Sequence, residues 1–494
     1  MAGMTGTGRP RWIRDRALLV ALVCTVSMAV GLGASPAFGV ASHAGANHDR
    51  RGAHDGHHRD DDESAVWRVY GHDLANTRTN TDEHAINRRT VAGLTEQWSK
   101  NGLVGVSGTP AVSHGVAYFA DWTGTVWAVR AATGQTIWTT KLGGPFVAAP
   151  ALGHDSVYVA TGATLFSLDR DTGALRWKVV TDPDPIAQIS ASPVVVGDLV
   201  IQGVASAGDV VAPAKYTFRG SIAAYDARTG ALVWRFFATA NDATSGPGVG
   251  IWSTPAVDRE HGLLYVGTGN TFVEPNAPLA DALLAIDLHT GKLVWSHQFT
   301  APDIFSGKGR TGPDADVGAS PNLWSDDGRD FVGVGDKAGT YHAFERRTGK
   351  LVWEDVLTPG SAFGGVLGSA SYTDGELLVP SNVGNPATNF PTGVAKVFAL
   401  DPETGAHRWV SPDLPGKILG PVSAVHGVVF VPTDSSQLFA LDTRTGAQLW
   451  TFRAPAQSAC GPSIVDGRVL WGYGFTLFSG SGPGGILSFS LERM

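Results

Sequence analysis

A short motif, Thr-Gly-x-x-x-Trp, recurs seven times along the chain and constrains its fold more than any other feature. An acidic residue usually stands three positions before the threonine, although the first copy carries Arg130 there. This pattern predicts a turn capped by a side chain, a left-handed glycine, and then a strand whose tryptophan packs inward. The glycine and tryptophan pairs are Gly134/Trp138, Gly173/Trp177, Gly230/Trp234, Gly291/Trp295, Gly349/Trp353, Gly405/Trp409 and Gly446/Trp450.

The motif is a hairpin, whose turn joins one strand to the tryptophan strand, and two further strand patterns lie before it. Each unit therefore holds four short strands, as a propeller blade does. The last unit ends on the apolar stretch 486–491 without a tryptophan strand, whereas 94–98 is a tryptophan strand without a blade. Joining these two strands closes the ring and leaves no exposed sheet edge. The sequence therefore predicts an all-β fold over residues 66–494, an eight-bladed β-propeller with the N-terminal strand closing the last blade.

The first 65 residues are predicted to lie outside the propeller. Residues 1–39 have four arginines, an apolar run and then small residues, which is typical of a secretory signal peptide. Cys24 follows Val23, where lipidation would need a small residue, so no lipid anchor is expected. Residues 40–65 are rich in His and Asp and predict a disordered tether. Loose metal binding is the alternative function for its histidines, which are His43, His48, His54, His57 and His58.

These segments predict a secreted, extracytoplasmic protein with no membrane span after signal cleavage, and a monomer is expected.

The composition of the chain limits the kinds of partner and site that it can have. The chain has 37 Lys plus Arg against 45 Asp plus Glu, a net charge of -8, which disfavours nucleic acid. Only 2 cysteines are present, which excludes a disulfide scaffold or a thiolate zinc array. Cys460 is expected to be a small buried residue.

The uneven length of the repeats indicates where a site lies. Successive motif tryptophans are separated by 39, 57, 61, 58, 56 and 41 residues, so blades three to six carry inserts. These inserts occupy 238–252, 298–317 and 355–366 between blades, and 205–219, 270–282 and 382–393 between second and third strands. Both kinds of connection emerge on one face, opposite the Thr-Gly turns. A site is therefore expected on this loop face, around the central channel.

The loop face lacks the common catalytic motifs. The chain has no Gly-x-Ser-x-Gly elbow, phosphate loop, dinucleotide fingerprint, His-Glu-x-x-His or Cys-x-x-Cys-His haem motif. It does carry oxygen-bearing side chains and one lysine, and carboxylate and amide oxygens suit Ca²⁺. Composition alone equally allows simple surface solvation for each of them. The candidates are Asp209, Asn270, Asp314, Asp316 and Lys337.

Several longer stretches match a known family. They are Tyr70-Gly-His-Asp-Leu-Ala-Asn-Thr-Arg78, Tyr216-Thr-Phe-Arg-Gly-Ser221, Ile251-Trp-Ser-Thr-Pro255, Tyr265-Val-Gly-Thr-Gly-Asn270 and Gly312-Pro-Asp-Ala-Asp-Val-Gly-Ala-Ser-Pro321. On these residues the chain resembles the quinoprotein alcohol dehydrogenases, nearest to their polyvinyl alcohol dehydrogenase branch. The family consists of eight-bladed propellers that bind pyrroloquinoline quinone and Ca²⁺.

The resemblance implies a role for six side chains. Asn270 would be a Ca²⁺ ligand, with Asp209 and Asp316 as the carboxylates near the metal. Asp314 would be the general base that removes the alcohol proton. The remaining two would hold the quinone, Trp252 by stacking beneath its plane and Lys337 by a hydrogen bond to one of its oxygens.

The resemblance implies a secreted oxidoreductase that oxidises an alcohol with pyrroloquinoline quinone and Ca²⁺. Since the chain has no haem motif, its electrons would pass to an external acceptor. The alternative is a non-catalytic propeller, a binding or scaffold module that has lost the cofactor. Three departures from the family pattern favour the alternative. The paired acidic motif reads Ser206-Ala-Gly-Asp209, the adjacent cysteine pair is replaced near 214–216, and an expected arginine is replaced by the apolar stretch 146–150.

Overall fold

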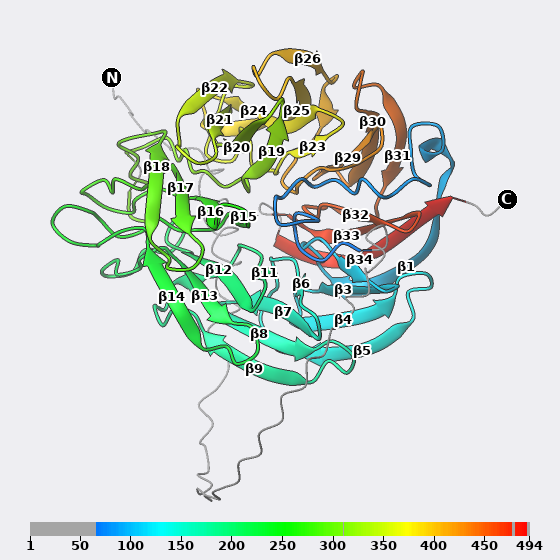
Figure 1. The fold of residues 1–494 in the computed structure, drawn as a ribbon, viewed down its shortest axis with the longest axis horizontal. Helices are drawn as coiled ribbons and strands as arrows, with labels where there is room; N and C mark the ends of the chain where they lie inside the picture. Colours follow the sequence, from blue (N-terminus) through cyan, green and yellow to red (C-terminus); the bar gives the residue numbers. More distant parts are fainter. Residues whose placement is uncertain (1–65, 310, 477–479, 492–494) are drawn as a thin grey trace, which may run out of the picture.

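The computed structural model describes residues 66–309, 311–476 and 480–491, which form eight antiparallel sheets around a central axis (Figure 1). The eight-bladed propeller predicted from the repeat is therefore confirmed. The predicted signal peptide and tether, 1–39 and 40–65, lie outside the described residues. Within the described residues the helical content is one 3-10 turn, η3 (Val91–Gly93), and no helix there is long and apolar enough to cross a membrane.

Blades 1 to 4 follow one another along the chain, each running from an inner to an outer strand. Blade 1 contains β2 (Ala111–Ser113), β3 (Val116–Ala120), β4 (Thr125–Arg130) and β5 (Thr136–Lys141). Blade 2 contains β6 (Ala151–Leu152), β7 (Ser156–Thr161), β8 (Thr164–Asp169) and β9 (Leu175–Val180). Blade 3 contains β11 (Val194–Val196), β12 (Leu199–Ser206), β13 (Ser221–Asp226) and β14 (Leu232–Phe237), with β10 (Ala187–Gln188) paired to β12. Blade 4 contains β15 (Ala256–Asp258), β16 (Leu263–Gly267), β17 (Ala282–Asp287) and β18 (Leu293–Gln298).

Blades 5 to 8 complete the ring. Blade 5 contains β19 (Asn322–Asp326), β20 (Arg329–Gly335), β21 (Thr340–Glu345) and β22 (Leu351–Val356). Blade 6 contains β23 (Ser371–Thr373), β24 (Glu376–Asn385), β25 (Phe390–Leu400) and β26 (His407–Val410), with β27 (Leu414–Pro415) paired to β25. Blade 7 contains β28 (Ser423–Val425), β29 (Val428–Thr433), β30 (Gln437–Asp442) and β31 (Gln448–Arg453). Blade 8 combines β32 (Ser463–Val465), β33 (Arg468–Thr476) and β34 (Gly480–Leu491) with β1 (Leu94–Val104).

The N-terminal strand closes the ring as the repeat predicts. Strand β1 is the outermost strand of blade 8, and it pairs antiparallel with β34 from Leu94 opposite Leu491. The indole Nε1 of Trp450, at the end of blade 7, donates a hydrogen bond to the Leu94 carbonyl at 3.1 Å. The first and last strands of the propeller are therefore joined by sheet pairing, and the tryptophan of blade 7 also contacts the first strand.

The motif predicts that the repeated tryptophans pack inward. The structure shows that they pack between neighbouring blades. Trp138 of blade 1 donates its Nε1 hydrogen to the Arg170 carbonyl in the turn of blade 2, at 2.9 Å. Its ring covers Gly173 of that turn, where a Cβ would stand 2.5 Å from Cε3 and where φ is +72°. Both the backbone angle and the space therefore require glycine.

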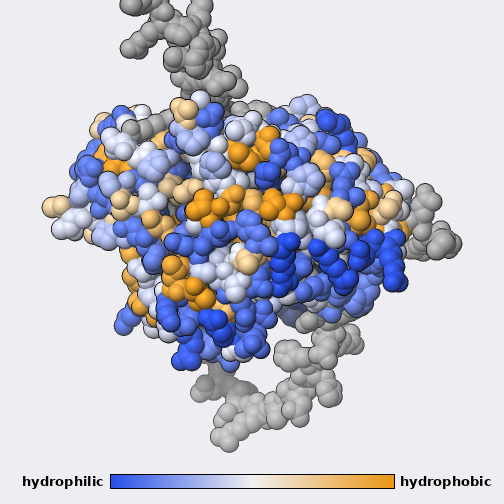
Figure 2. All heavy atoms as spheres, turned by 90° about the horizontal axis from the view of Figure 1, so that it is seen from above, coloured by the Kyte–Doolittle hydropathy of each residue, from blue (hydrophilic) through white to orange (hydrophobic). Residues whose placement is uncertain are grey.

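Surface apolar residues are concentrated on the rim. Figure 2 shows a mainly hydrophilic side of the molecule interrupted by small hydrophobic patches. Exposed apolar side chains occupy the outermost strands of several blades. They include Ile137 of β5, Val180 of β9, Val233 of β14, Val294 of β18, Val356 of β22 and Val410 of β26.

A segment before the first blade, 67–80, crosses the inner strands of the propeller. Its backbone pairs with Val112 of β2, Val257 of β15 and Ala424 of β28. Arg78 in this segment is fully buried, and burial lowers its pKa to about 10. Its guanidinium donates to carbonyl and hydroxyl oxygens, among them the Val422 carbonyl at 3.1 Å. The stretch that carried part of the family resemblance is thus a support for the inner strands.

The predicted inserts emerge where the motif spacing placed them, with one difference in their form. The insert 382–393 was expected to be a loop, but most of it is strand. Strands β24 and β25 extend beyond the blade and pair as far as Asn385 opposite Phe390. Blade 6 therefore carries a β-hairpin arm on the loop face.

Candidate functional site

A buried lysine and two buried aspartates form the centre of the candidate site. Lys337 follows strand β20 and is 5% exposed, and Asp314 and Asp316 are each 2% exposed. The Lys337 Nζ donates to Asp314 Oδ1 at 2.7 Å and to Asp316 Oδ2 at 2.5 Å. The backbone N–H of Lys337 also donates to the Asp316 carbonyl at 3.0 Å. The insert before blade 5 and the β20–β21 turn are therefore locked together around one cation.

Asn270 joins this group from the insert of blade 4. Its backbone N–H donates to Asp316 Oδ1 at 2.7 Å. Its side-chain amide donates to the carbonyls of Thr271, at 2.9 Å, and Phe305, at 2.5 Å. Because both amide hydrogens are engaged, the side-chain oxygen points the other way and is available to a ligand.

A small hollow lies between Asn270, Asp316, Asp209 and Trp252. Its volume is about 30 Å³, which is room for one water molecule or one ion. Carboxylate and amide oxygens form its polar wall. The hollow therefore brings together the three residues predicted from the sequence as metal ligands.

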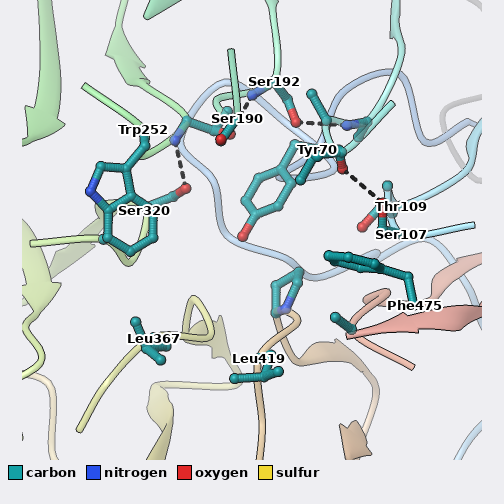
Figure 3. A pocket seen from close by; sticks show the side chains of 18 residues that line it. Tyr70, Ser107, Thr109, Ser190, Ser192, Trp252, Ser320, Leu367, Leu419 and Phe475 are labelled. Carbon is teal, nitrogen blue, oxygen red and sulfur yellow. Dashed lines mark hydrogen bonds between the residues drawn. The ribbon is translucent and has the colours of Figure 1, made fainter. Parts of the chain in front are cut away.

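Trp252 separates this hollow from a larger cavity on the propeller axis (Figure 3). The axial cavity has a volume of about 180 Å³. Figure 3 shows the indole of Trp252 on one side of it and Phe475 on the other, with Tyr70 between them. The Lys337 Nζ lies 5.6 Å from the centre of the indole ring. Trp252 thus presents a flat aromatic surface next to the lysine and the two aspartates.

Hydroxyl groups line the axial cavity in a chain from blade to blade. Ser192 Oγ accepts the Ala149 N–H at 2.9 Å, and Thr254 Oγ1 accepts the Ser192 N–H at 3.0 Å. Ser320 Oγ accepts the Thr254 N–H at 2.9 Å. Each of these hydroxyls can also donate its own hydrogen. The cavity wall therefore offers several hydrogen-bond donors.

Burial and charge perturb the ionisation of the central groups. Burial raises the pKa of Asp314 well above its ordinary value, against the opposing effect of the Lys337 ammonium. Burial by itself lowers the pKa of Lys337, but the carboxylates of Asp314 and Asp316 outweigh it and raise that pKa. The lysine therefore stays charged, while Asp314 is a stronger base than an exposed aspartate when it ionises.

Two further buried carboxyl groups belong to the same cluster and were not singled out in the sequence. Asp281 is fully buried, and neither of its side-chain oxygens has a hydrogen-bond partner. Burial, with the nearby Asp316 carboxylate, raises its pKa well above the ordinary value. Asp303 is also fully buried, and burial raises its pKa too. Both lie in predicted inserts, so considering every acidic residue of the inserts would have found them.

Comparison with known proteins finds two family models and several enzymes to which parts of this chain are similar. The model of the glucose/ethanol/alcohol dehydrogenase β-propeller domain, PQQ, matches residues 181–359, and that of the outer membrane protein assembly factor BamB matches 60–215 and 393–477. Polyvinylalcohol dehydrogenase of a Pseudomonas species is 28% identical over 70% of this chain and 59% of its own length. That of Sphingopyxis sp. (strain 113P3) is 29% identical over 63% and 52%. The chain is related to the quinoprotein alcohol dehydrogenases.

Solved structures of quinohemoprotein alcohol dehydrogenases show the same fold. ADHIIG from Pseudomonas putida HK5 superimposes with a TM-score of 0.73 at 20% identity, covering 87% of this chain and 80% of that one. The enzyme from Comamonas testosteroni gives a TM-score of 0.71 at 22% identity, covering 87% and 82%. The matched region spans only about half the length of the polyvinylalcohol dehydrogenases, from 52% to 59%.

The oxygen groups of this quinoprotein relative fit a hard cation. In the described part of the chain, no three His, Cys, Asp or Glu side chains converge on one metal position. The hollow instead combines the Asn270 amide oxygen with the carboxylates of Asp209 and Asp316. Five aspartates in the cluster face one lysine, and a bound cation would balance their excess negative charge. Among the residues that the structure describes, neither side-chain oxygen of Asp281 has a hydrogen-bond partner.

The structure brings together all six residues that the resemblance selected. Trp252, Asn270, Asp314 and Lys337 lie within one group on the loop face, with Asp209 and Asp316 at the hollow. Their chemical roles remain predictions. Cys460, in contrast, is fully buried in the core beside blade 8, and burial raises its thiol pKa to about 12. Its Sγ contacts the Gly108 carbonyl at 3.4 Å, which confirms a packing position.

Proposed function

We propose that this chain oxidises an alcohol group, with pyrroloquinoline quinone bound against Trp252 and Ca²⁺ bound by Asn270, Asp209 and Asp316. The electrons then pass to an external acceptor. The observation that supports this most is the ion-paired group of Lys337, Asp314 and Asp316, buried beside a flat indole on the loop face. This combination places a cation, a base and an aromatic plane side by side.

In this proposal each side chain has a separate task. The bound quinone would accept the hydride equivalent of the alcohol. Asp314 removes the hydroxyl proton, and its raised pKa makes it a better proton acceptor than an exposed aspartate. Lys337 orients Asp314 through the 2.7 Å ion pair and donates to a ligand oxygen. The hydroxyls of Ser192, Thr254 and Ser320 supply donors for cofactor carboxylates.

An aromatic rim supports a substrate with an apolar carbon chain. The Lys337 Nζ lies 5.8 Å from the centre of the Phe363 ring, and Phe363 stacks on Phe390 of the β-hairpin arm at 6.0 Å. Phe390 is 42% exposed, so the aromatic wall runs from the ion pair to solvent. An alcohol on a hydrocarbon or polymer chain would bury carbon there, which a small polar alcohol cannot do.

The proposal is tested with the purified protein, pyrroloquinoline quinone and Ca²⁺. Calorimetry is expected to show saturable binding at micromolar quinone, and dye reduction is expected with alcohols of increasing chain length. Asp314→Asn should keep quinone binding and lose about 10²- to 10⁴-fold in rate. Asp413→Asn, at an exposed surface ion pair, is the control. Absence of quinone binding at micromolar concentration would overturn the proposal.

The second candidate is a non-catalytic scaffold propeller. The match to the BamB model over 60–215 and 393–477 favours it, together with the missing cysteine pair of the quinone site. The same calorimetry separates the two functions, since a scaffold binds no quinone.

We also propose that the protein is extracytoplasmic and monomeric. Four arginines before an apolar run in 1–39 support export. Fractionation of cells that produce the full chain tests the location, and light scattering tests the oligomeric state.

A further inference from the structure

We propose that Asp303 is a positioning residue, which holds the backbone of Asp314 and thereby aims the base toward Lys337. Only the effect on turnover rests on the proposed function. The effect on the backbone rests on geometry alone.

The turn that carries Asp314 has an unusual backbone. Asp314 has φ of +64°, in the left-handed region that residues other than glycine rarely adopt. Such a conformation persists only where the surroundings impose it. The side chain depends on it, because the Asp314 carboxylate reaches Lys337 from this turn at 2.7 Å.

Asp303 supplies the contacts that impose this conformation. Its Oδ1 accepts the Asp314 N–H at 3.2 Å, and its Oδ2 accepts the Ala315 N–H at 2.7 Å. Two successive N–H groups therefore point at one carboxylate, as in an anion-binding nest. Both donors are buried, so an amide in place of the carboxylate, with only one oxygen, would leave one of them unpaired.

Asp303 is itself fixed to the insert that carries the metal-ligand candidate Asn270. The Asp303 N–H donates to Asn276 Oδ1 at 3.0 Å, and the Thr271 N–H donates to the Asp303 carbonyl at 3.3 Å. Gly312 completes the arrangement, because a Cβ there would stand 1.9 Å from Asp303 Oδ1. One carboxylate thus links the metal side and the base side of the site.

Asp303→Asn tests the inference by amide hydrogen exchange of the full chain. The peptide that contains residues 312–317 should exchange at least about tenfold faster than in the wild type, because one buried N–H loses its acceptor. Asp281→Asn is the matched control, since Asp281 is equally buried and its side-chain oxygens accept no hydrogen bond from this turn. If Asp303→Asn leaves exchange at 312–317 unchanged, the inference is wrong.

Turnover distinguishes positioning from general packing. With quinone and Ca²⁺ bound, Asp303→Asn should lower kcat about 10- to 100-fold while KM for the alcohol changes less than threefold. The effect should vanish in an Asp314→Asn background, because Asp303 acts through Asp314. Equal losses in both backgrounds would overturn the inference.

A second variant covers the case in which Asp303→Asn fails to fold. Gly312→Ala keeps the carboxylate but pushes it from the two N–H groups, so it should accelerate the same exchange and lower kcat. Unchanged exchange in Gly312→Ala would also contradict the inference. If the wild-type protein reduces no dye, the proposed function is wrong. Amide hydrogen exchange at 312–317 would then still test whether Asp303 holds the turn that carries Asp314.

Discussion

Gly318 lies directly against the indole of Trp252, where a Cβ at position 318 would stand 1.8 Å from Cη2. The aromatic plane of the site therefore depends on a residue without a side chain in the neighbouring blade. Gly318→Ala should displace the indole and weaken quinone binding at least about tenfold, since a stacked ring loses its support. Calorimetry measures the affinity, and near-ultraviolet circular dichroism reports the indole. Gly309→Ala is the control, because nothing lies within 4 Å of a Cβ there.

Lys337 is the only cation that forms ion pairs with Asp314 and Asp316 among the described residues. Lys337→Gln leaves both buried carboxylates without a counter-charge and should lower the free energy of unfolding by about 3–5 kcal/mol without metal. Lys396→Gln, which breaks a more exposed pair with Asp413, should cost no more than about 1 kcal/mol. Urea unfolding measures the free energy of unfolding of both variants.

Added Ca²⁺ should restore more stability to Lys337→Gln than to the wild type, because the variant carries more uncompensated negative charge. Equal stabilisation of the two proteins by Ca²⁺ would show that the cation does not bind next to this cluster.

The buried carboxyl of Asp281 predicts how stability depends on pH. Its pKa in the folded protein is raised well above the ordinary value of 3.8. The folded state therefore holds this proton more tightly than the unfolded chain, and stability is lost as pH rises from about 4 through the raised pKa. The Tm of the metal-free protein should fall between pH 5 and pH 8, and Asp281→Asn should flatten this slope.

A carboxyl group with a lowered pKa, such as Asp258, does not oppose this trend. The pKa of Asp258 is lowered, since His261 and Arg346 outweigh the effect of burial. Its contribution to stability is therefore lost only below about pH 4. If Asp281→Asn retains the full slope of Tm against pH, Asp281 is not the group responsible.

The fold could be predicted from the sequence because the Thr-Gly-x-x-x-Trp motif recurs seven times. Every copy of the motif gives the same glycine and tryptophan spacing, so a single irregular unit does not change the result. The role of the tryptophan was only partly predictable. Trp138 and Gly173 belong to different motif copies, and their contact exists only after neighbouring blades stack.

The candidate site was predictable where a single insert or motif carried the residue, as for Asp314 and Lys337. Asp281, Asp303 and Gly318 were missed because their importance lies in contacts between distant segments. Gly318 faces Trp252 across 66 residues of chain, and no local pattern marks that pair. Burial of Asp281 is likewise a property of the assembled blades, since it lies in a turn directly before β17 and no local motif marks its carboxyl group.

The contribution of the contact between neighbouring motif copies to stability can be measured by comparing two glycines, both of which have a left-handed backbone conformation. Gly291 has φ of +68°, and a Cβ there would stand 2.4 Å from Cε3 of Trp234. Gly115 has φ of +70°, but nothing lies within 4 Å of its Cβ position. Gly115→Ala should cost about 1–2 kcal/mol from backbone strain alone. Gly291→Ala should cost about 1–3 kcal/mol more, because the methyl group also collides with the indole.

Urea unfolding gives the difference between these two variants. Trp234→Ala in the Gly291→Ala background removes the collision, so the two changes should be non-additive. Additive losses would mean that the tryptophan does not rest on the glycine of the next blade. Equal losses in Gly115→Ala and Gly291→Ala would lead to the same conclusion, because the repeat would then specify only a turn and not the joint between blades.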